Sequence, residues 1–318
     1  MSRAAALLAA VLLLVGTAGC GGDGAEPGAP RGATLALDFA PNAAHAGIYA
    51  ALARGHYRRA GVDLAVRAPA ESAETPRLLA AGRVDAAVLD IHDLGIARRR
   101  GLDLVGVLPL VQRPLAAVLA RRDRGIRSPR DLAGRTVGVT GLPSDEAVVD
   151  SAVSAAGGDP RAVRRLTIGF NAVSALAAGK VDAATGFWSA EGVALRRLGA
   201  PVRAFRVDRW GAPPYPELVL AVRRRTLDAD PALVDAIVAA TRRGYAFAAR
   251  RPDAALADLL AAEPELRRAE QAAQLRALLP VLAPRPFDRR VLRRWAAWDR
   301  RHGILGRRLD VDAAFRLR

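Results

Sequence analysis

The chain has 318 residues, of which 51% are hydrophobic and 5% aromatic, and it carries a formal charge of +16. This length is enough for a large core and favours two lobes over one. Arginine supplies 47 of the 48 basic residues, and these are spread over every segment without a basic stripe interleaved with aromatic residues. We therefore exclude nucleic-acid binding and expect no nucleic-acid partner.

The N-terminal segment predicts export. Arg3 precedes the apolar run 4–15, which has the length of a signal-peptide core and is too short to span a membrane, since that takes roughly 20 apolar residues. The run ends in Thr17-Ala-Gly-Cys20, and Cys20 is the only cysteine. Small residues before a lone cysteine resemble the lipobox of bacterial lipoproteins, although Thr17 departs from the aliphatic residue usual there. We predict a signal peptide over 1–19 and lipidation of Cys20; the alternative is an ordinary signal peptide with an incidental cysteine.

A flexible tether is predicted next, because residues 20–32 are rich in glycine and have no large apolar side chain after Cys20. A lipidated cysteine followed by such a tether holds a folded domain near a membrane without embedding it. No cysteine follows Cys20, so we expect no disulfide in the mature protein.

An internal repeat predicts two similar lobes. The sequence Leu79-Ala-Ala-Gly-Arg-Val-Asp-Ala-Ala87 recurs 97 positions later as Leu176-Ala-Ala-Gly-Lys-Val-Asp-Ala-Ala184. In each copy a helix is predicted to end at a glycine in the left-handed conformation, Gly82 or Gly179, before a short strand. Upstream strands also correspond: 34–37 with 136–139, and 62–66 with 164–168. Alternating strands and helices indicate an α/β fold with a parallel sheet in each lobe.

The C-terminal third is predicted to be largely helical. Residues 231–250 form an amphipathic run, and further helices are expected over 253–262, 266–279 and 288–301. Residues 219–222 are predicted as a strand that returns the chain from the second lobe to the first. We therefore assign 33–120 with 220–318 to lobe 1 and 121–219 to lobe 2, with hinges near 118–122 and 215–221.

The ligand site is predicted in the cleft between the lobes. Ligands of such sheets bind outside the carboxyl ends of the strands. That rule selects two loops from each lobe, 38–42 and 90–93 from the first, and 140–145 and 186–191 from the second.

Catalytic motifs are absent from the sequence, which has no Gly-x-Ser-x-Gly elbow, Walker loop or dinucleotide fingerprint. The four histidines lack metal-ligand spacing. The one alternative is a metal held by His92, Asp90 and Asp93. Because the sequence offers no further clear ligand, we expect no metal and no cofactor. The single lysine, Lys180, lies in the last turn of a predicted helix, where a solvent-facing structural role is favoured.

Recognition chemistry is concentrated in the loop 186–191. Phe187 and Trp188 offer flat apolar faces beside the carboxylate of Glu191, which suits a planar heteroaromatic molecule with N–H groups. One of the two aromatic residues is expected to fill the core instead. Tyr49 and Tyr215 are candidates for a second face of the site.

The helix that begins near Ser144 bears on the charge of the ligand. Ser144 is the predicted N-cap, and Asp145 and Glu146 occupy the first turn. A helix N-terminus attracts anions, but these two carboxylates already compensate it. We therefore expect an uncharged or cationic ligand rather than an anionic one.

Five stretches carry a resemblance to a known family. The chain resembles the thiamine-pyrimidine-precursor binding proteins of ABC importers, within the broader nitrate, sulfonate and thiamine-precursor superfamily, over about residues 33–300. The stretches that carry the resemblance are Leu37-Asp-Phe-Ala-Pro-Asn42, His45-Ala-Gly-Ile-Tyr49, Val111-Gln-Arg-Pro-Leu115, Gly141-Leu-Pro-Ser-Asp-Glu146 and Gly186-Phe-Trp-Ser-Ala-Glu-Gly192.

The resemblance implies a two-lobed type II periplasmic-binding fold and a hydroxymethylpyrimidine or formylated aminomethylpyrimidine ligand. Phe39 stands where the family often has Trp, Ser189 where it often has Asn, and Asp90-Ile-His-Asp93 replaces its Tyr-Gln loop, so a different small heterocycle or amine is the alternative ligand. With the residue chemistry above, the predicted ligand-binding residues are Asp38, Asn42, His45, Tyr49, Asp90, Ser144, Phe187, Trp188, Glu191 and Tyr215.

The implied partners are a permease and an ATPase, with the membrane reached through the N-terminal lipid and the protein itself a monomer. The superfamily also contains pyrimidine synthases that use a Schiff-base lysine and a cysteine-rich motif. This chain has only Lys180 and no cysteine after Cys20, so we predict a binding protein rather than an enzyme. The sequence leaves open a sulfonate or nitrate binding protein and a lipoprotein sensor.

Overall fold

The computed structural model describes residues 29–69, 74–282 and 285–317. The predicted signal peptide and Cys20 lie outside these ranges. Within them, no helix combines the length and apolar character that a membrane crossing requires. The first strand begins at Arg31, two residues inside the predicted tether, because the backbone of Arg31 and Gly32 pairs with Val62 and Asp63.

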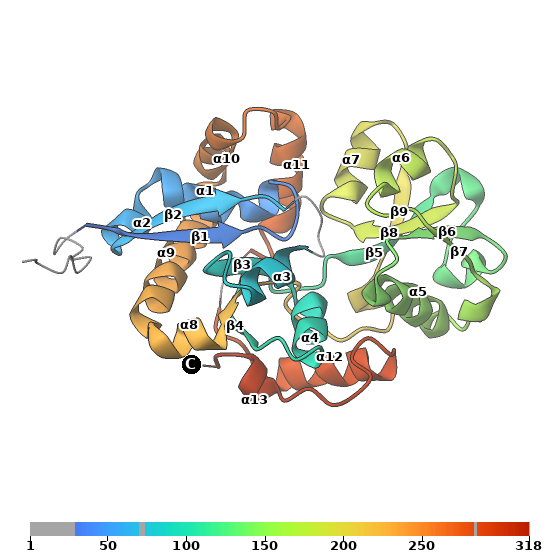
Figure 1. The fold of residues 1–318 in the computed structure, drawn as a ribbon. Coiled ribbons are helices and arrows are strands. Elements are labelled where there is room, and N and C mark those ends of the chain that lie inside the picture. Colours follow the sequence, from blue (N-terminus) through green and yellow to red (C-terminus); the bar gives the residue numbers. More distant parts are fainter. Residues whose placement is uncertain (1–28, 70–73, 283–284, 318) are drawn as a thin grey trace, which may run out of the picture.

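Two five-stranded sheets form the centres of two lobes in the described part of the chain (Figure 1). The first sheet has the order β2 (Val62–Arg67), β1 (Arg31–Ala36), β3 (Ala86–Asp90), β10 (Leu218–Arg223) and β4 (Leu104–Pro109). The second has the order β7 (Arg164–Thr167), β6 (Thr136–Val139), β8 (Ala183–Phe187), β5 (Ala116–Arg121) and β9 (Val202–Arg206). The two orders correspond strand for strand, as the repeat in the sequence indicates.

Both sheets are mixed, so the prediction of wholly parallel sheets is wrong. β1, β2 and β3 are parallel, as are β6, β7 and β8, but β10 runs antiparallel to β3 and β4, and β5 runs antiparallel to β8 and β9. Each antiparallel strand adjoins a segment that crosses between the lobes. β10 confirms the strand predicted to return the chain to the first lobe. The chain changes sheets between Pro109 and Ala116, earlier than the boundary expected at 120–121.

The repeated aspartates make the same contacts in the two lobes. Asp85 accepts a hydrogen bond from the Thr34 N–H at 2.8 Å, and Asp182 accepts one from the Thr136 N–H at 2.9 Å. The N–H of each aspartate donates in return to the carbonyl of the same threonine, at 2.9 Å. Gly82 and Gly179 have φ of 72° and 68°, as predicted for the helix ends before them. Each repeat thus ties a helix-to-strand turn to the neighbouring strand, β1 or β6.

These contacts give a prediction for stability. Replacing Asp85 by Ala removes the acceptor of a partly buried N–H, so we expect the free energy of unfolding to fall by about 1–3 kcal/mol. Urea denaturation followed by circular dichroism measures the change. Asp63→Ala is the matched control, because the exposed Asp63 side chain on β2 pairs with exposed Arg58 at 3.5 Å. Equal losses in the two variants would contradict the assignment.

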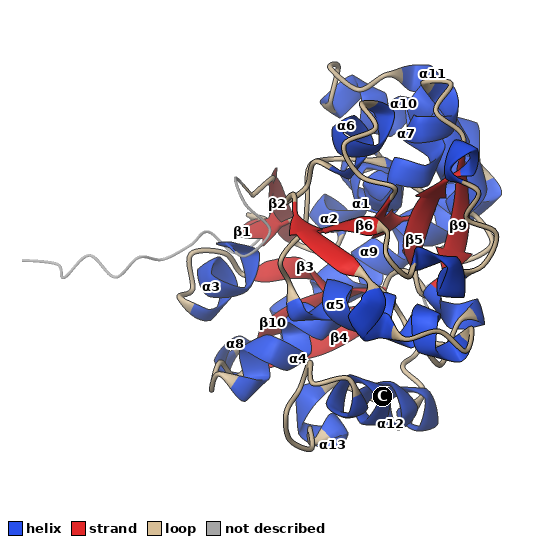
Figure 2. Cartoon of the chain, turned by 90° about the vertical axis from the view of Figure 1, so that its right-hand side faces the viewer, coloured by secondary structure: helices blue, strands red, loops and turns tan. Residues whose placement is uncertain are grey.

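Helices pack around the strands of both sheets (Figure 2). The predicted helix over 231–250 is confirmed to the residue, with Asp230 accepting from the Leu233 N–H at its start. The helices are α1 (Ala46–Ala53), α2 (His56–Arg59), α3 (Glu74–Ala80), α4 (Ile91–Arg99), α5 (Pro143–Ala155), α6 (Ala172–Ala177), α7 (Glu191–Arg197), α8 (Arg224–Ala229), α9 (Pro231–Arg250), α10 (Pro252–Ala262), α11 (Arg268–Leu278), α12 (Arg289–Arg301) and α13 (Val311–Ala314). Short 3-10 turns are η1 (Ala43–His45), η2 (Arg122–Arg124), η3 (Pro129–Leu132), η4 (Pro160–Ala162) and η5 (Val207–Arg209).

The C-terminal helices join the two lobes. α11 contacts η1 in the first lobe and α7 in the second. On the opposite side, α12 runs below both lobes (Figure 1), and its buried Trp298 donates to Ser151 Oγ of α5 at 3.3 Å. The C-terminal helices therefore contact both lobes.

Candidate functional site

A cavity of about 130 Å³ lies between the two lobes. All four segments predicted at the strand ends contribute to its wall. The lining residues from these segments are Asp38, Phe39 and Asn42 after β1, Asp90 and Asp93 at the end of β3, Thr140, Leu142, Ser144 and Asp145 after β6, and Gly186, Phe187, Ser189, Ala190 and Glu191 at the end of β8. The strand-end rule thus locates the cavity, because the parallel strands of both lobes point their carboxyl ends at the cleft.

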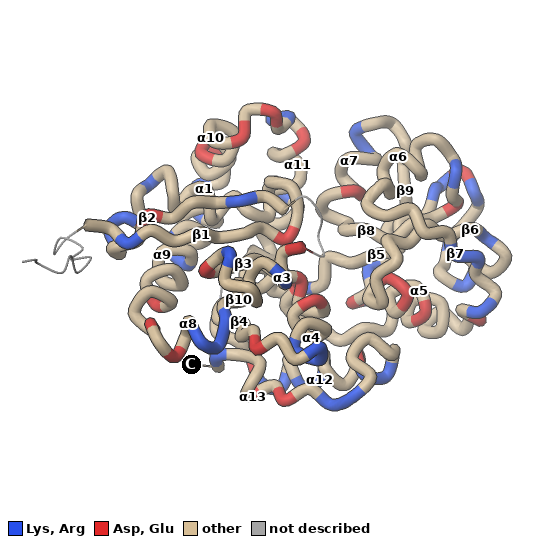
Figure 3. The backbone as a smooth tube through the Cα atoms, viewed as in Figure 1, with Lys and Arg blue, Asp and Glu red and all other residues tan. Residues whose placement is uncertain are grey.

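The cavity wall is acidic although the protein is strongly basic. Five carboxyl groups line it, and no lysine, arginine or histidine is among the described lining residues. Figure 3 shows acidic segments where the two lobes face each other, while basic segments lie mostly on the outer surface. A wall of this kind favours hydrogen-bond donors and cations and repels anions. The five are Asp38, Asp90, Asp93, Asp145 and Glu191.

Asp38 is held in place by a buried histidine. His45 Nε2 lies 2.8 Å from Asp38 Oδ1, and the Asn42 N–H donates to His45 Nδ1 at 3.2 Å. Because Nδ1 accepts, the ring hydrogen is on Nε2 and is donated to Asp38. His45 is fully buried and does not line the cavity. It orients Asp38 from behind the described cavity wall, whereas the sequence predicts it as a direct ligand contact.

The start of α5 places Asp145 at the cavity wall. Asp145 Oδ2 accepts from the Thr140 N–H at 2.8 Å and from Thr185 Oγ1 at 2.7 Å. The helix begins at Pro143 with Leu142 at the N-cap, so the prediction that Ser144 is the N-cap is wrong. Proline suits the first helical position, because its missing N–H would have no helical partner there. The helix therefore starts at Pro143, closer to the N-terminus than predicted. Ser144 nevertheless lines the cavity.

Glu191 begins α7 and faces the same space. Its Oε2 accepts from the Phe187 N–H at 2.8 Å, which fixes the side chain at the end of β8. Burial raises the pKa of Glu191 above its usual range. Phe187 lines the cavity beside it.

Asp93 differs from the other wall carboxyls because it makes no hydrogen bond or ion pair within the described residues. It lies in the first turn of α4 and is half-buried. Burial, with a contribution from nearby Asp90, raises its pKa to about 7. A partly buried carboxyl with no protein partner is available to bind a ligand. The sequence suggests Asp93 only as a metal ligand, although the strand-end rule already includes its loop.

Trp188 does not line the cavity, although the sequence predicts it as a ligand contact. Its Nε1 donates to the Pro114 carbonyl at 3.1 Å, and the Arg206 guanidinium lies 4.2 Å from the ring centroid. The ring therefore packs on a segment that crosses between the lobes. Of the aromatic pair at 187–188, Phe187 lines the cavity and Trp188 does not.

Neither predicted tyrosine reaches the cavity. Tyr49 is 4% exposed and donates to Glu263 at 2.6 Å, which anchors α1 to the end of α10. Tyr215 is fully buried and packs edge-on against His92, with ring centroids 5.0 Å apart. Tyr215 also lies against Trp298 of α12, with ring centroids 6.2 Å apart. Both tyrosines thus pack on C-terminal helices, which local sequence patterns do not reveal.

Aromatic and polar side chains that the sequence does not suggest complete the wall. Phe39 and Phe170 come from opposite lobes, and their ring centroids are 5.5 Å apart. Phe170 follows β7, so the strand-end rule applied to that strand would have found it. Gln274 and Leu278 come from α11, and no signal in the sequence indicates that this helix reaches the cleft.

Comparison with known proteins places these features in a family. A family model described as NMT1/THI5 like matches residues 42–255. The formylaminopyrimidine-binding protein of Halalkalibacterium halodurans is 31% identical over 230 residues, which cover 72% of this chain and 70% of that protein. The 4-amino-5-hydroxymethyl-2-methylpyrimidine phosphate synthase of Legionella pneumophila is 28% identical over 74% of each chain.

Solved structures identify the fold. The alkanesulfonate-binding protein SsuA from Xanthomonas axonopodis pv. citri, bound to MOPS, is similar with a TM-score of 0.74 at 18% identity. The match covers 91% of this chain and 99% of that protein. The predicted two-lobed α/β binding-protein fold is thereby confirmed.

Proposed function

The chain belongs to the NMT1/THI5-like family, and from this premise we propose that it is the substrate-binding protein of an ABC importer and captures a thiamine pyrimidine precursor. The ligand class is a small planar heterocycle bearing N–H groups. The single observation that carries the proposal is the acidic cavity wall, which offers five carboxyls and, among the described lining residues, no basic side chain.

The same wall argues against an anionic ligand. A sulfonate or nitrate would be taken out of water into a space lined with carboxyl groups, where no described lining residue carries a positive charge to replace its hydration. The relationship to the sulfonate-binding protein therefore supports the fold, and the cavity chemistry favours a different ligand.

The size and shape of the cavity suit a single aromatic ring. Its volume of about 130 Å³ is well below the roughly 300–1,000 Å³ of pockets for drug-sized ligands. Phe39, Phe170 and Phe187 offer apolar ring faces among the carboxyls. Offset stacking on such a face contributes about 0.5–1.5 kcal/mol beyond burial of the ring. An aminopyrimidine combines that face with donors for Asp93 and Glu191.

Placement of the lysine supports binding rather than synthesis. Lys180, the only lysine in the chain, is exposed in the turn after α6 and does not line the cavity. A Schiff base between the wall and a carbonyl ligand therefore has no amine to form it. We propose a binding protein and not a synthase.

The N-terminal features complete the proposal. A signal peptide over 1–19 and lipidation at Cys20 would place the protein on the outer face of the cell membrane, as a monomer, beside its permease and ATPase. The lobes would hinge at the two crossing segments, between β4 and β5 and between β9 and β10. The hinge predicted near 118–122 falls largely within β5, and the one predicted near 215–221 overlaps the start of β10. Trp188 packs on the first of these segments at Pro114.

Isothermal titration of the full chain with hydroxymethylpyrimidine, its formylaminomethyl analogue, taurine and nitrate tests this function. We expect binding of a pyrimidine and none of either anion. Replacing Glu191 by Gln keeps an acceptor for the Phe187 N–H but removes the charge, so pyrimidine affinity should fall by about tenfold or more, as for a hydrogen bond to a charged group. Glu146→Gln, outside the cavity on α5, is the control and should bind normally. Tight anion binding without a pyrimidine response would refute the ligand class.

A further inference from the structure

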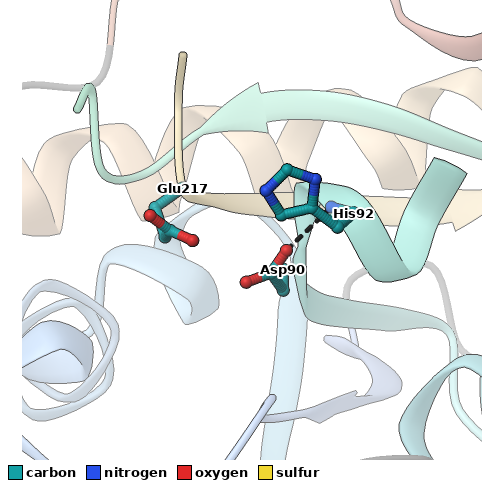
Figure 4. A group of neighbouring side chains, drawn as sticks. All are labelled: Asp90, His92 and Glu217. Carbon is teal, nitrogen blue, oxygen red and sulfur yellow. Dashed lines mark hydrogen bonds between the residues drawn. The ribbon is translucent and has the colours of Figure 1, made fainter. Parts of the chain in front are cut away.

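Behind the cavity wall, two side chains from the β3–α4 junction and one from the crossing segment before β10 converge on one buried space (Figure 4). Asp90 ends β3, His92 lies in the first turn of α4, and Glu217 immediately precedes β10. One carboxylate oxygen of each acid and one imidazole nitrogen lie within 4.8 Å of one another. Carboxylate and imidazole together are ligands for first-row divalent metal ions.

Two of these ligand atoms have no hydrogen-bond partner among the residues that the structure describes. His92 Nε2 and Glu217 Oε1 are buried without a hydrogen bond, in side chains that are 2% and 1% exposed. Figure 4 shows a ring nitrogen of His92 directed toward Glu217. A buried polar atom left without a partner costs about 1–3 kcal/mol, so two of them facing the same space point to a bound species.

The remaining atoms of the same side chains are fixed by hydrogen bonds. His92 Nδ1 lies 2.9 Å from Asp299 Oδ2 and 3.2 Å from Trp295 Nε1, and Asp90 Oδ1 accepts from the His92 N–H at 2.7 Å. Glu217 Oε2 accepts from the N–H groups of Leu115 and Ala116, the latter at 3.2 Å. A histidine that gives one nitrogen to a carboxylate and points the other at a cluster of acids has the outer-shell arrangement of metal-binding histidines.

Charge balance also favours a cation here. Asp90, Glu217 and Asp299 are gathered around one imidazole, and in the described part of the chain the ion pair between His92 and Asp299 is the only one that these four residues form. Buried carboxylates require a paired cation, a metal ion or protons.

We propose that Asp90, His92 and Glu217 bind a divalent first-row transition-metal ion such as Zn²⁺, with Asp299 orienting His92 from behind. Zinc bound at about 2.0–2.2 Å from each atom draws the three groups slightly together. Asp90 also lines the ligand cavity, and Glu217 holds the crossing segment at Leu115. The ion therefore connects the cavity wall to the junction of the lobes. This site does not depend on which molecule occupies the cavity.

Metal titration of the tag-free full chain tests the site. After dialysis against EDTA, calorimetry with ZnCl₂ should show about one tightly bound zinc per chain. His92→Gln and Glu217→Gln should abolish this binding, and Asp299→Asn should weaken it by about 10–100-fold, the usual effect of losing an outer-shell carboxylate. Asp63→Asn is the control, because exposed Asp63 on β2 pairs with exposed Arg58 and lies outside the ligand set, so zinc affinity should be unchanged.

A second measurement covers variants that fail to fold. Electron spin-echo spectroscopy of the copper-loaded wild-type chain should show a coordinated imidazole nitrogen, and His56→Gln, which alters an exposed histidine on α2, should keep that signal. The proposal is overturned if the wild type binds no metal, if His92→Gln and Glu217→Gln both retain wild-type zinc affinity, or if no imidazole signal is present.

Discussion

Replacing Asp93 by Asn is expected to make the free protein more stable at pH 8 while weakening pyrimidine binding. Asp93 is half-buried without a partner among the described residues, and its pKa is raised to about 7. At pH 8 the folded protein must hold an ionised carboxylate that water solvates better in the unfolded chain. The rise in the pKa of Asp93 from 3.8 to about 7 lowers the free energy of unfolding at pH 8 by at most roughly 4 kcal/mol. The neutral amide of Asn does not carry this cost.

The pH dependence of that stability difference has a definite sign. Since the folded protein holds the proton of Asp93 more tightly, the wild type loses stability as pH rises from about 4 to 7, and the loss is constant above 7. The advantage of Asp93→Asn should therefore be largest at pH 8 and shrink toward pH 4. Urea denaturation of EDTA-dialysed protein at several pH values measures it, with no bound cation contributing. Asp63→Asn, on the exposed face of β2, should show no such trend.

Ligand affinity should move in the opposite direction. A ligand amine that donates to the Asp93 carboxylate loses about 1.5–3 kcal/mol in Asp93→Asn, which is roughly a 10- to 150-fold loss of affinity. In the wild type, affinity should also fall below pH 7 as Asp93 takes up a proton. Calorimetry at pH 6 and pH 8 checks both effects. If Asp93→Asn destabilises the protein and binds normally, Asp93 is structural and does not contact the ligand.

A gain in stability with a loss of binding is typical of a residue kept for function. The other wall carboxyls are different, because Asp38 is bonded to His45 and Asp145 to Thr140 and Thr185. Their loss should cost both stability and binding. Asp93 therefore offers the cleanest separation of recognition from folding in this cavity.

The sequence predicts most elements because their signals are local. The helix over 231–250 has an amphipathic period and the Asp230-Pro231 start, and the repeat locates the turns at Gly82 and Gly179. The antiparallel direction of β5 and β10 has no local signal, because the sequence of each strand is typical of any buried strand. Only the neighbouring strands reveal its direction. Register and partner choice are set by the whole sheet.

The site follows the same division. The strand-end rule found the four loops, because backbone direction alone decides which edge of a sheet they occupy. Which side chain of a loop faces the cavity depends on packing from distant segments. Trp188 turns to the Pro114 carbonyl, and Tyr49 turns to Glu263, 214 positions away. The contribution of α11 depends wholly on tertiary packing.

That packing gives the second large prediction: Gly244→Val should cost at least about 3 kcal/mol of stability and displace one edge of the cavity. Gly244 lies in α9 where it crosses α1, and a Cβ placed on it would overlap the Gly47 carbonyl oxygen and lie 2.7 Å from the Ala51 Cβ. Backbone atoms of two packed helices leave no room for the valine side chain, so the helices must separate.

The displacement should reach the ligand site, because α1 continues directly from the 3-10 turn that carries Asn42 and His45 to the cavity edge. We expect a lower midpoint in urea and, in protein that remains folded, weaker pyrimidine binding through loss of the His45 hydrogen bond to Asp38. Gly32→Val is the matched control: Gly32 lies in β1 with nothing within 4 Å of the added Cβ, and valine suits a strand. A wild-type midpoint in Gly244→Val would show that α1 and α9 do not require this close approach, and would remove the link between the C-terminal helix and the position of Asp38.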